Sequence, residues 1–319
     1  MRIAVMAAGG LGGYYGALLA RSGHEVALIA RGAHLRAIQE RGLEIRSAGG
    51  DFQITPARAT DRPADIGPVD WVLFSVKTYD NPAAIQAMRP LVGDGTLIIT
   101  FQNGVSSPDE LGQAFGAERV LLAPTQIVSN IAAPGIIEQK STFRTSVIGE
   151  AGGKEISPRA RQVADELRKC GVDATAVPDG LVPLWDKFVF LASVAGLATL
   201  ARTQPYDLFK HAEASAVLRE AVQEVYRVGV ACKIPLPTDT VERWHRFVLG
   251  FLPGVKPSME LDQEAGKRLE IDALSGTVVR LGAANGVPTP VHQTIYAALK
   301  REDERAQARL SQARAGAAS

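Results

Sequence analysis

The feature that most constrains this fold is a glycine-rich turn close to the start of the chain. An apolar run at 3–6 leads into the sequence AAGGLG at 7–12, and a helix pattern covers 11–21. A strand, a tight turn and a helix N-terminus with unpaired N–H groups form a cradle for a pyrophosphate. A glycine-rich turn without a ligand is the alternative. Because a Cβ makes left-handed backbone costly, we expect a negative φ at Ala7. The residues expected to bind a dinucleotide are Ala7, Gly9, Gly10, Leu11 and Gly12.

Short apolar runs alternate with amphipathic segments over the first half of the chain, as in successive βαβ units. The expected strands cover 3–6, 25–30, 71–76, 96–100 and 120–123. The expected helices cover 11–21, 34–41, 82–91 and 108–115. Glycines suited to left-handed caps follow three of them, at Gly23, Gly42 and Gly116. Further antiparallel strands are expected on the same sheet between 127 and 148, then a helix at 157–170 and a strand at 173–177. The pattern predicts a Rossmann-type, doubly wound sheet.

Strand patterns disappear after the turn cluster at 178–180, and helix patterns take over. The expected helices cover 183–202, 212–231, 239–249, 269–284 and 291–305. The predicted fold class is therefore α/β plus all-α, with a helical C-terminal domain. The expected domains are a nucleotide-binding domain at 1–178, a helical domain for substrate binding and dimerisation at 179–305, and a flexible tail at 306–319. The apolar helix faces make a homodimer the candidate oligomeric state.

Composition and charge exclude several classes of protein. Basic and acidic residues number 35 and 34, so the net charge of +1 creates no global field that favours nucleic acid or an anionic membrane. Cys170 and Cys232 lack disulfide-framework or metal-ligand spacing, and the five histidines are interpreted as surface or loop residues. The apolar stretch 188–201 is too short to span a bilayer, and the glycines at 9–16 would interrupt an N-terminal secretion signal. We expect a reduced, cytoplasmic protein with no metal, nucleic acid or membrane partner.

Three residues follow expected strands at the edge where parallel sheets bind ligands. Arg31 occupies the place where NAD-specific folds carry an acidic residue, and a cation there suits a 2′-phosphate. NADPH or NADP+ is therefore the expected cofactor, with a solvated loop residue as the alternative for Arg31. Lys77 and Asn103 follow the strands at 71–76 and 96–100, and an ordinary surface lysine is the alternative for Lys77.

Taken together, these motifs resemble the ketopantoate reductases, or 2-dehydropantoate 2-reductases, over nearly the whole chain. The segments that carry the resemblance are GGLGGYYGALLARSGHEV at 9–26, ARGAHLRAI at 30–38, SVK at 75–77, QNG at 102–104, LWDK at 184–187 and RLEID at 268–272. The resemblance implies an active site in the cleft between a nucleotide-binding domain and a helical domain. The implied activity is NADPH-dependent reduction of a 2-oxo acid to a 2-hydroxy acid, foremost 2-dehydropantoate to pantoate in pantothenate biosynthesis.

The resemblance also implies roles for individual residues. Lys187 corresponds to the catalytic lysine that protonates the carbonyl oxygen, and Glu270 to its partner carboxylate. Ser258 and Asn103 correspond to substrate-binding residues, and Asn103 also to a residue near the nicotinamide. Hydride addition builds negative charge on the carbonyl oxygen, so a positioned proton donor suits this chemistry. A purely structural ion pair between two helices is the alternative for Lys187 and Glu270. The residues matched to basic side chains around the cofactor phosphate are Arg31 and Lys77.

Some positions in the implied substrate pocket depart from the family pattern. Where asparagines usually follow the catalytic lysine, this chain has Leu191 and Ala195, and Gln204 is the nearest amide where a further asparagine is often found. Each missing donor costs about 1–3 kcal/mol when a substrate polar group is left unpaired. These departures favour, as an alternative, a reductase of the same family that acts on a more apolar 2-oxo acid. A non-catalytic NADP(H)-binding protein is a further alternative, which the presence of Lys187 and Glu270 disfavours.

Overall fold

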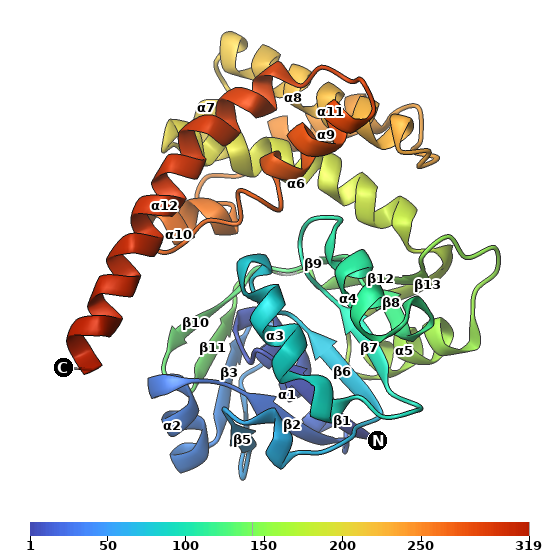
Figure 1. Ribbon diagram of the computed structural model, residues 1–319, viewed down its shortest axis with the longest axis vertical. Coiled ribbons are helices and arrows are strands. Elements are labelled where there is room, and N and C mark those ends of the chain that lie inside the picture. Colours follow the sequence, from blue (N-terminus) through green and yellow to red (C-terminus); the bar gives the residue numbers. More distant parts are fainter. Residues whose placement is uncertain (142, 319) are drawn as a thin grey trace. The chain divides into compact units, whose positions relative to one another are not determined.

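The computed structural model describes residues 1–141 and 143–318 (Figure 1). The chain divides into two compact units. The first comprises Met1–Gln102 and Ser107–Pro183, and the second comprises Asn103–Ser106 and the chain from Leu184 onward. The domain limits predicted from the sequence, at 178 and 305, stay predictions.

The first unit is built on a nine-stranded sheet in the order β13-β12-β8-β7-β6-β1-β2-β5, with β9 paired to β12. Six neighbouring strands, from β5 to β8, pair in parallel. The order of strands along the chain reverses at β1, which is where nucleotides bind in such sheets. The Rossmann-type α/β sheet predicted from the sequence is confirmed. Its strands are β1 (Arg2–Met6), β2 (Glu25–Ile29), β5 (Arg58–Thr60), β6 (Trp71–Phe74), β7 (Leu97–Thr100), β8 (Val120–Leu122), β9 (Thr125–Gln126), β12 (Thr145–Glu150) and β13 (Asp173–Asp179).

A second, four-stranded sheet corrects the prediction for residues 127–148. The sequence predicts that strands in this range extend the main sheet. Instead, β10 (Ser129–Ala133) and β11 (Ile136–Gln139) form a separate sheet with β3 (Leu43–Ser47) and β4 (Phe52–Ile54), in the order β10-β11-β3-β4. Strand β12, which begins within this range, joins the main sheet, where it is antiparallel to β8 and β9 and parallel to β13. Alternating burial indicates a strand but does not identify its partner, so the sequence pattern could not decide between the sheets.

The helices of the first unit agree with the sequence pattern within a few residues. Glycines with positive φ follow three of them, at Gly23, Gly42 and Gly116. The ψ of −174° at Gly42 and of 130° at Gly116 lies outside the left-handed helical region, so these two glycines are not left-handed caps. The helices are α1 (Gly10–Arg21), α2 (Gly32–Arg41), α3 (Asn81–Ala87), α4 (Ser107–Phe115) and α5 (Pro158–Lys169). Short 3₁₀ turns cover Pro63–Asp65, Thr78–Asp80, Arg89–Leu91 and Ala117–Arg119.

The second unit is helical, which confirms the predicted fold class. Its helices are α6 (Leu181–Ala201), α7 (Pro205–Leu208), α8 (Ala212–Ala231), α9 (Thr240–Leu249), α10 (Ser258–Glu264), α11 (Ser275–Ala284) and α12 (Pro290–Ala318). The expected helix at 269–284 is wrong in its first part, because 269–274 is irregular and only α11 is helical. Helix α12, the long red helix of Figure 1, continues through Ala318 although the sequence predicts a tail from 306. The flexibility of that segment stays a prediction.

Helix α6 forms part of the core of the helical unit. Its residues Phe188, Val189, Ala192 and Ala198 are at most 1% exposed. Among the described residues, α6 is the helix that is long and apolar enough to cross a membrane, but 61% of the apolar window is buried inside the protein. A core helix meets the same length and composition criteria, so this feature is weak support for a membrane span.

Candidate active site

The glycine turn lies between β1 and α1 and is fixed by hydrogen bonds from neighbouring strands. Ala7 has φ +75°, which corrects the negative φ expected from its Cβ. Its carbonyl accepts a hydrogen bond of 3.0 Å from Ser75 Oγ, just beyond β6. Ala8 donates from its N–H to the Ile29 carbonyl at the end of β2, at 2.8 Å. These bonds from two neighbouring strands stabilise a conformation that propensity alone disfavours by about 1–2 kcal/mol.

The N-terminus of α1 provides donors suited to a phosphate. Gly9 is the N-cap residue, and no side chain caps the helix at this end, which lies wholly within the described residues. The N–H groups of Gly10, Leu11 and Gly12 have no intrahelical acceptor, because the first internal bond runs from the Gly13 N–H to the Gly9 carbonyl at 2.8 Å. A Cβ built on Gly9 would meet no atom within 4 Å. Open space and orphan donors therefore fit the pyrophosphate of a dinucleotide.

Two glycines of the turn are required by packing, which the sequence motif does not reveal. A Cβ on Gly10 would lie 2.5 Å from the Ser129 carbonyl oxygen of β10, so the second sheet approaches α1 here. A Cβ on Gly12 would lie 2.1 Å from Ser75 Oγ and 2.4 Å from the Ala7 carbonyl oxygen. Gly12 therefore allows the helix to start directly against the turn.

The interpretation of all five histidines as surface or loop residues is wrong for the buried His292 and for His34 and His245, which are partly buried within helices. His34 is partly buried, and its Nδ1 accepts a hydrogen bond from the Gly135 N–H at 3.0 Å. Its Nε2 must therefore carry the proton that is donated to the Ala8 carbonyl at 3.0 Å, so His34 links α2 to the glycine turn. His292 is fully buried, and burial lowers its pKa to about 4. Burial depends on tertiary packing, which isolated histidines in a sequence do not indicate.

The two basic residues predicted to bind the cofactor phosphates lie at strand ends of the main sheet. Arg31 is the N-cap residue of α2, directly after β2, and it is exposed. Lys77 precedes the 3₁₀ turn Thr78–Asp80 after β6 and is partly buried. Both follow strands adjacent to β1, where the sheet order reverses. Their roles toward a cofactor stay predictions that this placement supports.

A buried polar network, which the sequence analysis did not find, holds the segment before Asn103. Gln102 donates from Nε2 to the Val76 carbonyl and to Asn81 Oδ1, each at 2.7 Å. Asn81 donates in turn to Ser107 Oγ at 3.1 Å. Asn81, Gln102 and Ser107 are at most 7% exposed. The network fixes both ends of the segment 103–106.

Lys187, Asn103 and Glu270 all belong to the helical unit. Lys187, in the second turn of α6, donates from Nζ to Asn103 Oδ1 at 3.0 Å. Burial lowers the pKa of Lys187 to about 8, while the negative charge of Glu270 opposes that decrease. Glu270 is 7% exposed and lies in the irregular segment before α11. The helical unit therefore contains an ammonium group with a lowered pKa, an amide oxygen that accepts its hydrogen bond, and a carboxylate whose charge acts on it.

The predicted substrate-binding residues have different environments. Leu191 is partly buried on α6, and Ala195 is 1% exposed. Ser258 is exposed at the start of α10. Gln204 already uses both ends of its amide, accepting from the Gly254 N–H at 2.7 Å and donating to the Asp207 carboxylate. Gln204 therefore stabilises loop structure rather than replacing a missing substrate amide.

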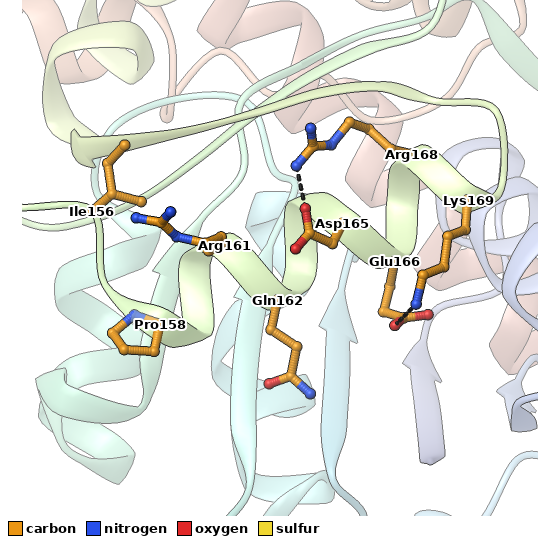
Figure 2. Close-up of a pocket in the computed structure, with 8 residues that line it drawn as sticks. All are labelled: Ile156, Pro158, Arg161, Gln162, Asp165, Glu166, Arg168 and Lys169. Carbon is orange, nitrogen blue, oxygen red and sulfur yellow. Dashed lines mark hydrogen bonds and ion pairs between the residues drawn. The ribbon is translucent and has the colours of Figure 1, made fainter.

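A separate hollow runs along α5 and is lined by charged and polar side chains (Figure 2). Arg168 and Lys169 there are paired with Asp165 and Glu166. No predicted site residue lines this hollow. Among the residues that the structure describes, no group of three or more His, Cys, Asp or Glu side chains could hold a metal ion.

Three features indicate a nicotinamide-dependent oxidoreductase: the Rossmann-type sheet, the open glycine turn and the lysine with a lowered pKa. Comparison with known families makes this specific: residues 3–153 match "Ketopantoate reductase PanE/ApbA", and residues 182–303 match "Ketopantoate reductase PanE/ApbA C terminal". The chain belongs to the ketopantoate reductase family, as the sequence resemblance implied. It is an oxidoreductase of this family, whose members use a nicotinamide cofactor.

Individual relatives cover nearly the whole chain. The 2-dehydropantoate 2-reductase of Aquifex aeolicus is 26% identical over 308 residues, which are 95% of this chain and 97% of that protein. The crystal structure of 2-dehydropantoate 2-reductase from Geobacter metallireducens is 32% identical with a TM-score of 0.89, covering 94% of this chain and 99% of that one. A D-mandelate dehydrogenase solved with NADH and anilino(oxo)acetate has a TM-score of 0.88 at 22% identity, with 96% and 99% covered, and shares the fold.

Proposed function

We propose that this protein reduces a 2-oxo acid to a 2-hydroxy acid with NADPH, and that 2-dehydropantoate is the first substrate to test. The observation that carries the proposal is the Lys187–Asn103 contact of 3.0 Å under the charge of Glu270. When bound, a reduced nicotinamide cofactor supplies the hydride to the carbonyl carbon. A role in pantothenate biosynthesis and a cytoplasmic location belong to the same proposal.

Lys187 is suited to give the matching proton to the carbonyl oxygen. With a pKa of about 8, its ammonium group stays mostly protonated at neutral pH but is more acidic than an exposed lysine. The charge of Glu270 prevents a larger decrease of that pKa, and Asn103 Oδ1 orients the ammonium group. One hydride and one proton are added to the ketone, so the products are the 2-hydroxy acid and NADP+.

A more apolar substrate is the second candidate, and the residues at the substrate positions implied by the family resemblance favour it. Leu191 and Ala195 offer no hydrogen bond where the family pattern has amides, and Gln204 is already engaged by its own loop. A D-mandelate dehydrogenase shares this fold, so an aromatic 2-oxo acid belongs in the test.

A substrate panel distinguishes the two candidates. We expect NADPH oxidation with 2-dehydropantoate and compare its kcat/KM with those of linear, branched and aromatic 2-oxo acids lacking the hydroxyl group. Because an unpaired polar group costs about 1–3 kcal/mol, a preference of roughly 5- to 150-fold for an apolar acid would identify the second candidate. Cofactor binding without oxidation across the whole panel would instead indicate a non-catalytic protein.

The cofactor preference depends on Arg31. Replacing Arg31 with alanine removes a charged hydrogen-bond donor, so we expect the Kd for NADPH to rise about 10- to 100-fold and the Kd for NADH to change little. Fluorescence titration of both cofactors measures this. Arg36→Ala is the matched control, because Arg36 is an exposed arginine on the same helix. Equal weakening of both cofactors would contradict the assignment of Arg31 to the 2′-phosphate.

A further inference from the structure

The segment that carries Glu270 has no regular secondary structure, yet it is anchored firmly on its N-terminal side. The Leu269 N–H donates to Asp303 Oδ1 at 2.8 Å. Arg268 donates to the same carboxylate from Nε at 3.3 Å and from Nη2 at 3.1 Å. Asp303 lies on α12 and is 0% exposed. The chain before Glu270 is therefore attached to α12 by a buried, multiply bonded carboxylate.

The C-terminal side of Glu270 is attached to the same helix. Asp272 accepts hydrogen bonds from Tyr296 Oη at 2.8 Å and Lys300 Nζ at 2.6 Å, both on α12. Its own carbonyl accepts from Thr277 Oγ1 at 3.1 Å and Arg280 Nη1 at 3.3 Å, both on α11. Burial raises the pKa of Asp272, but the hydrogen bonds from Lys300 and Tyr296 outweigh it and keep the pKa below its ordinary value.

The side chains next to Glu270 point into the core. Leu269 is 2% exposed and Ile271 is 0% exposed. With both neighbours packed, Asp272 bonded to α12 and the Leu269 N–H bonded to Asp303 of α12, little freedom is left in the backbone that presents Glu270. Because the interaction between charges depends on their separation, the effect of Glu270 on Lys187 depends on that backbone position.

We propose that Asp272 and Asp303 are positioning residues that use α12 to hold Glu270 where its charge acts on Lys187. This inference rests on the proposed function, since it gives α12 a role only through the proposed acid–base pair. Neither aspartate is assigned a contact with substrate or cofactor. The groups acting on Asp272 are Lys300, Tyr296 and Arg280, and the charge acting on Lys187 is that of Glu270.

The test is the pH profile of kcat in Asp272→Asn. This variant keeps the size of the side chain but weakens its charged hydrogen bonds to α12. We expect kcat to fall about tenfold, with little change in the Kd for NADPH, because small misplacements of catalytic groups are costly. The alkaline limb of the profile should move to lower pH, since Glu270 would then raise the pKa of Lys187 less. Glu270→Gln should move the limb in the same direction and by at least as much.

Two further variants make the result specific. Tyr296→Phe removes one of the two α12 bonds to Asp272, so it should cause a smaller change of the same sign while preserving the fold. Asp165→Asn breaks a comparable ion pair with Arg168 on α5 and should leave both kcat and the limb unchanged. In the Glu270→Gln background, Asp272→Asn should have no further effect on kcat, because both changes act through one group.

The outcomes separate this inference from the proposed function. Wild-type kcat and pH profile in Asp272→Asn, with Glu270→Gln impaired, would overturn only the positioning role. Full additivity in the double variant would overturn it too, because independent effects would then be present. Wild-type turnover in Glu270→Gln would refute the proposed acid–base pair itself, whatever kcat is measured for Asp272→Asn.

Discussion

Replacing Lys187 with alanine is expected to lower kcat for 2-oxo acid reduction by roughly 10²–10⁴-fold, the usual contribution of a positioned general acid. The ammonium group with a pKa of about 8 is the proposed proton donor, and alanine offers none. Steady-state oxidation of NADPH with the best substrate of the panel measures the effect. The Kd for NADPH should change far less, because Lys187 is assigned to proton transfer, whereas the glycine turn at 7–12 is the segment proposed to bind the cofactor phosphates.

The pKa of Lys187 also predicts how kcat of the wild type depends on pH. A proton donor must be protonated, so kcat should fall as pH rises through about 8, and this limb should be missing from the residual activity of Lys187→Ala. Lys187→Arg is the control for charge, because a guanidinium keeps the positive charge but does not release a proton near neutral pH. Wild-type turnover in the alanine variant would refute the assigned mechanism.

Replacing Gly12 with alanine is expected to damage both stability and cofactor binding. The added Cβ would lie 2.4 Å from the Ala7 carbonyl oxygen, which is backbone, and 2.1 Å from Ser75 Oγ. The turn must shift to relieve this overlap, so we expect a loss of roughly 1–3 kcal/mol in the free energy of unfolding. Chemical denaturation measures the stability change, and titration with NADPH should show weakened binding.

Gly9→Ala is the matched control for this prediction. Gly9 has φ −77°, which alanine adopts without strain, and its Cβ would meet no protein atom within 4 Å. Unfolding should therefore be unchanged, while the methyl group occupies the open space assigned to the pyrophosphate and raises the Kd for NADPH. If Gly9→Ala binds NADPH as tightly as the wild type, the cofactor does not approach the helix at this residue.

Much of the fold could be predicted because its signals are local. The parallel strands are short apolar runs, the helices have amphipathic periodicity, and glycines such as Gly42 follow helices with a positive φ that other residues disfavour. The separate sheet of β10, β11, β3 and β4 could not be predicted, because its parallel pairing of β11 with β3 joins segments far apart in the chain. The sequence pattern predicts helix over 269–274, because apolar spacing does not indicate the hydrogen bonds to α12 that hold this segment.

The candidate site divides in the same way. The glycine motif and its spacing identified Gly12 and Arg31 as candidates, and the resemblance to the family identified Lys187 and Glu270. The bonds of His34 to Ala8 and Gly135 were missed, because no local pattern reports them.

The sequence by itself determined the nucleotide-binding sheet, the helical second half and the family, because periodicity, caps and motif spacing act over a few residues. Only the tertiary structure decided that Ala7 has a positive φ, that Gly10 makes room for β10, and that α12 anchors the segment around Glu270. Each of these depends on atoms brought together from distant parts of the chain. Their energies come from packing and hydrogen bonds that form only when the whole unit folds.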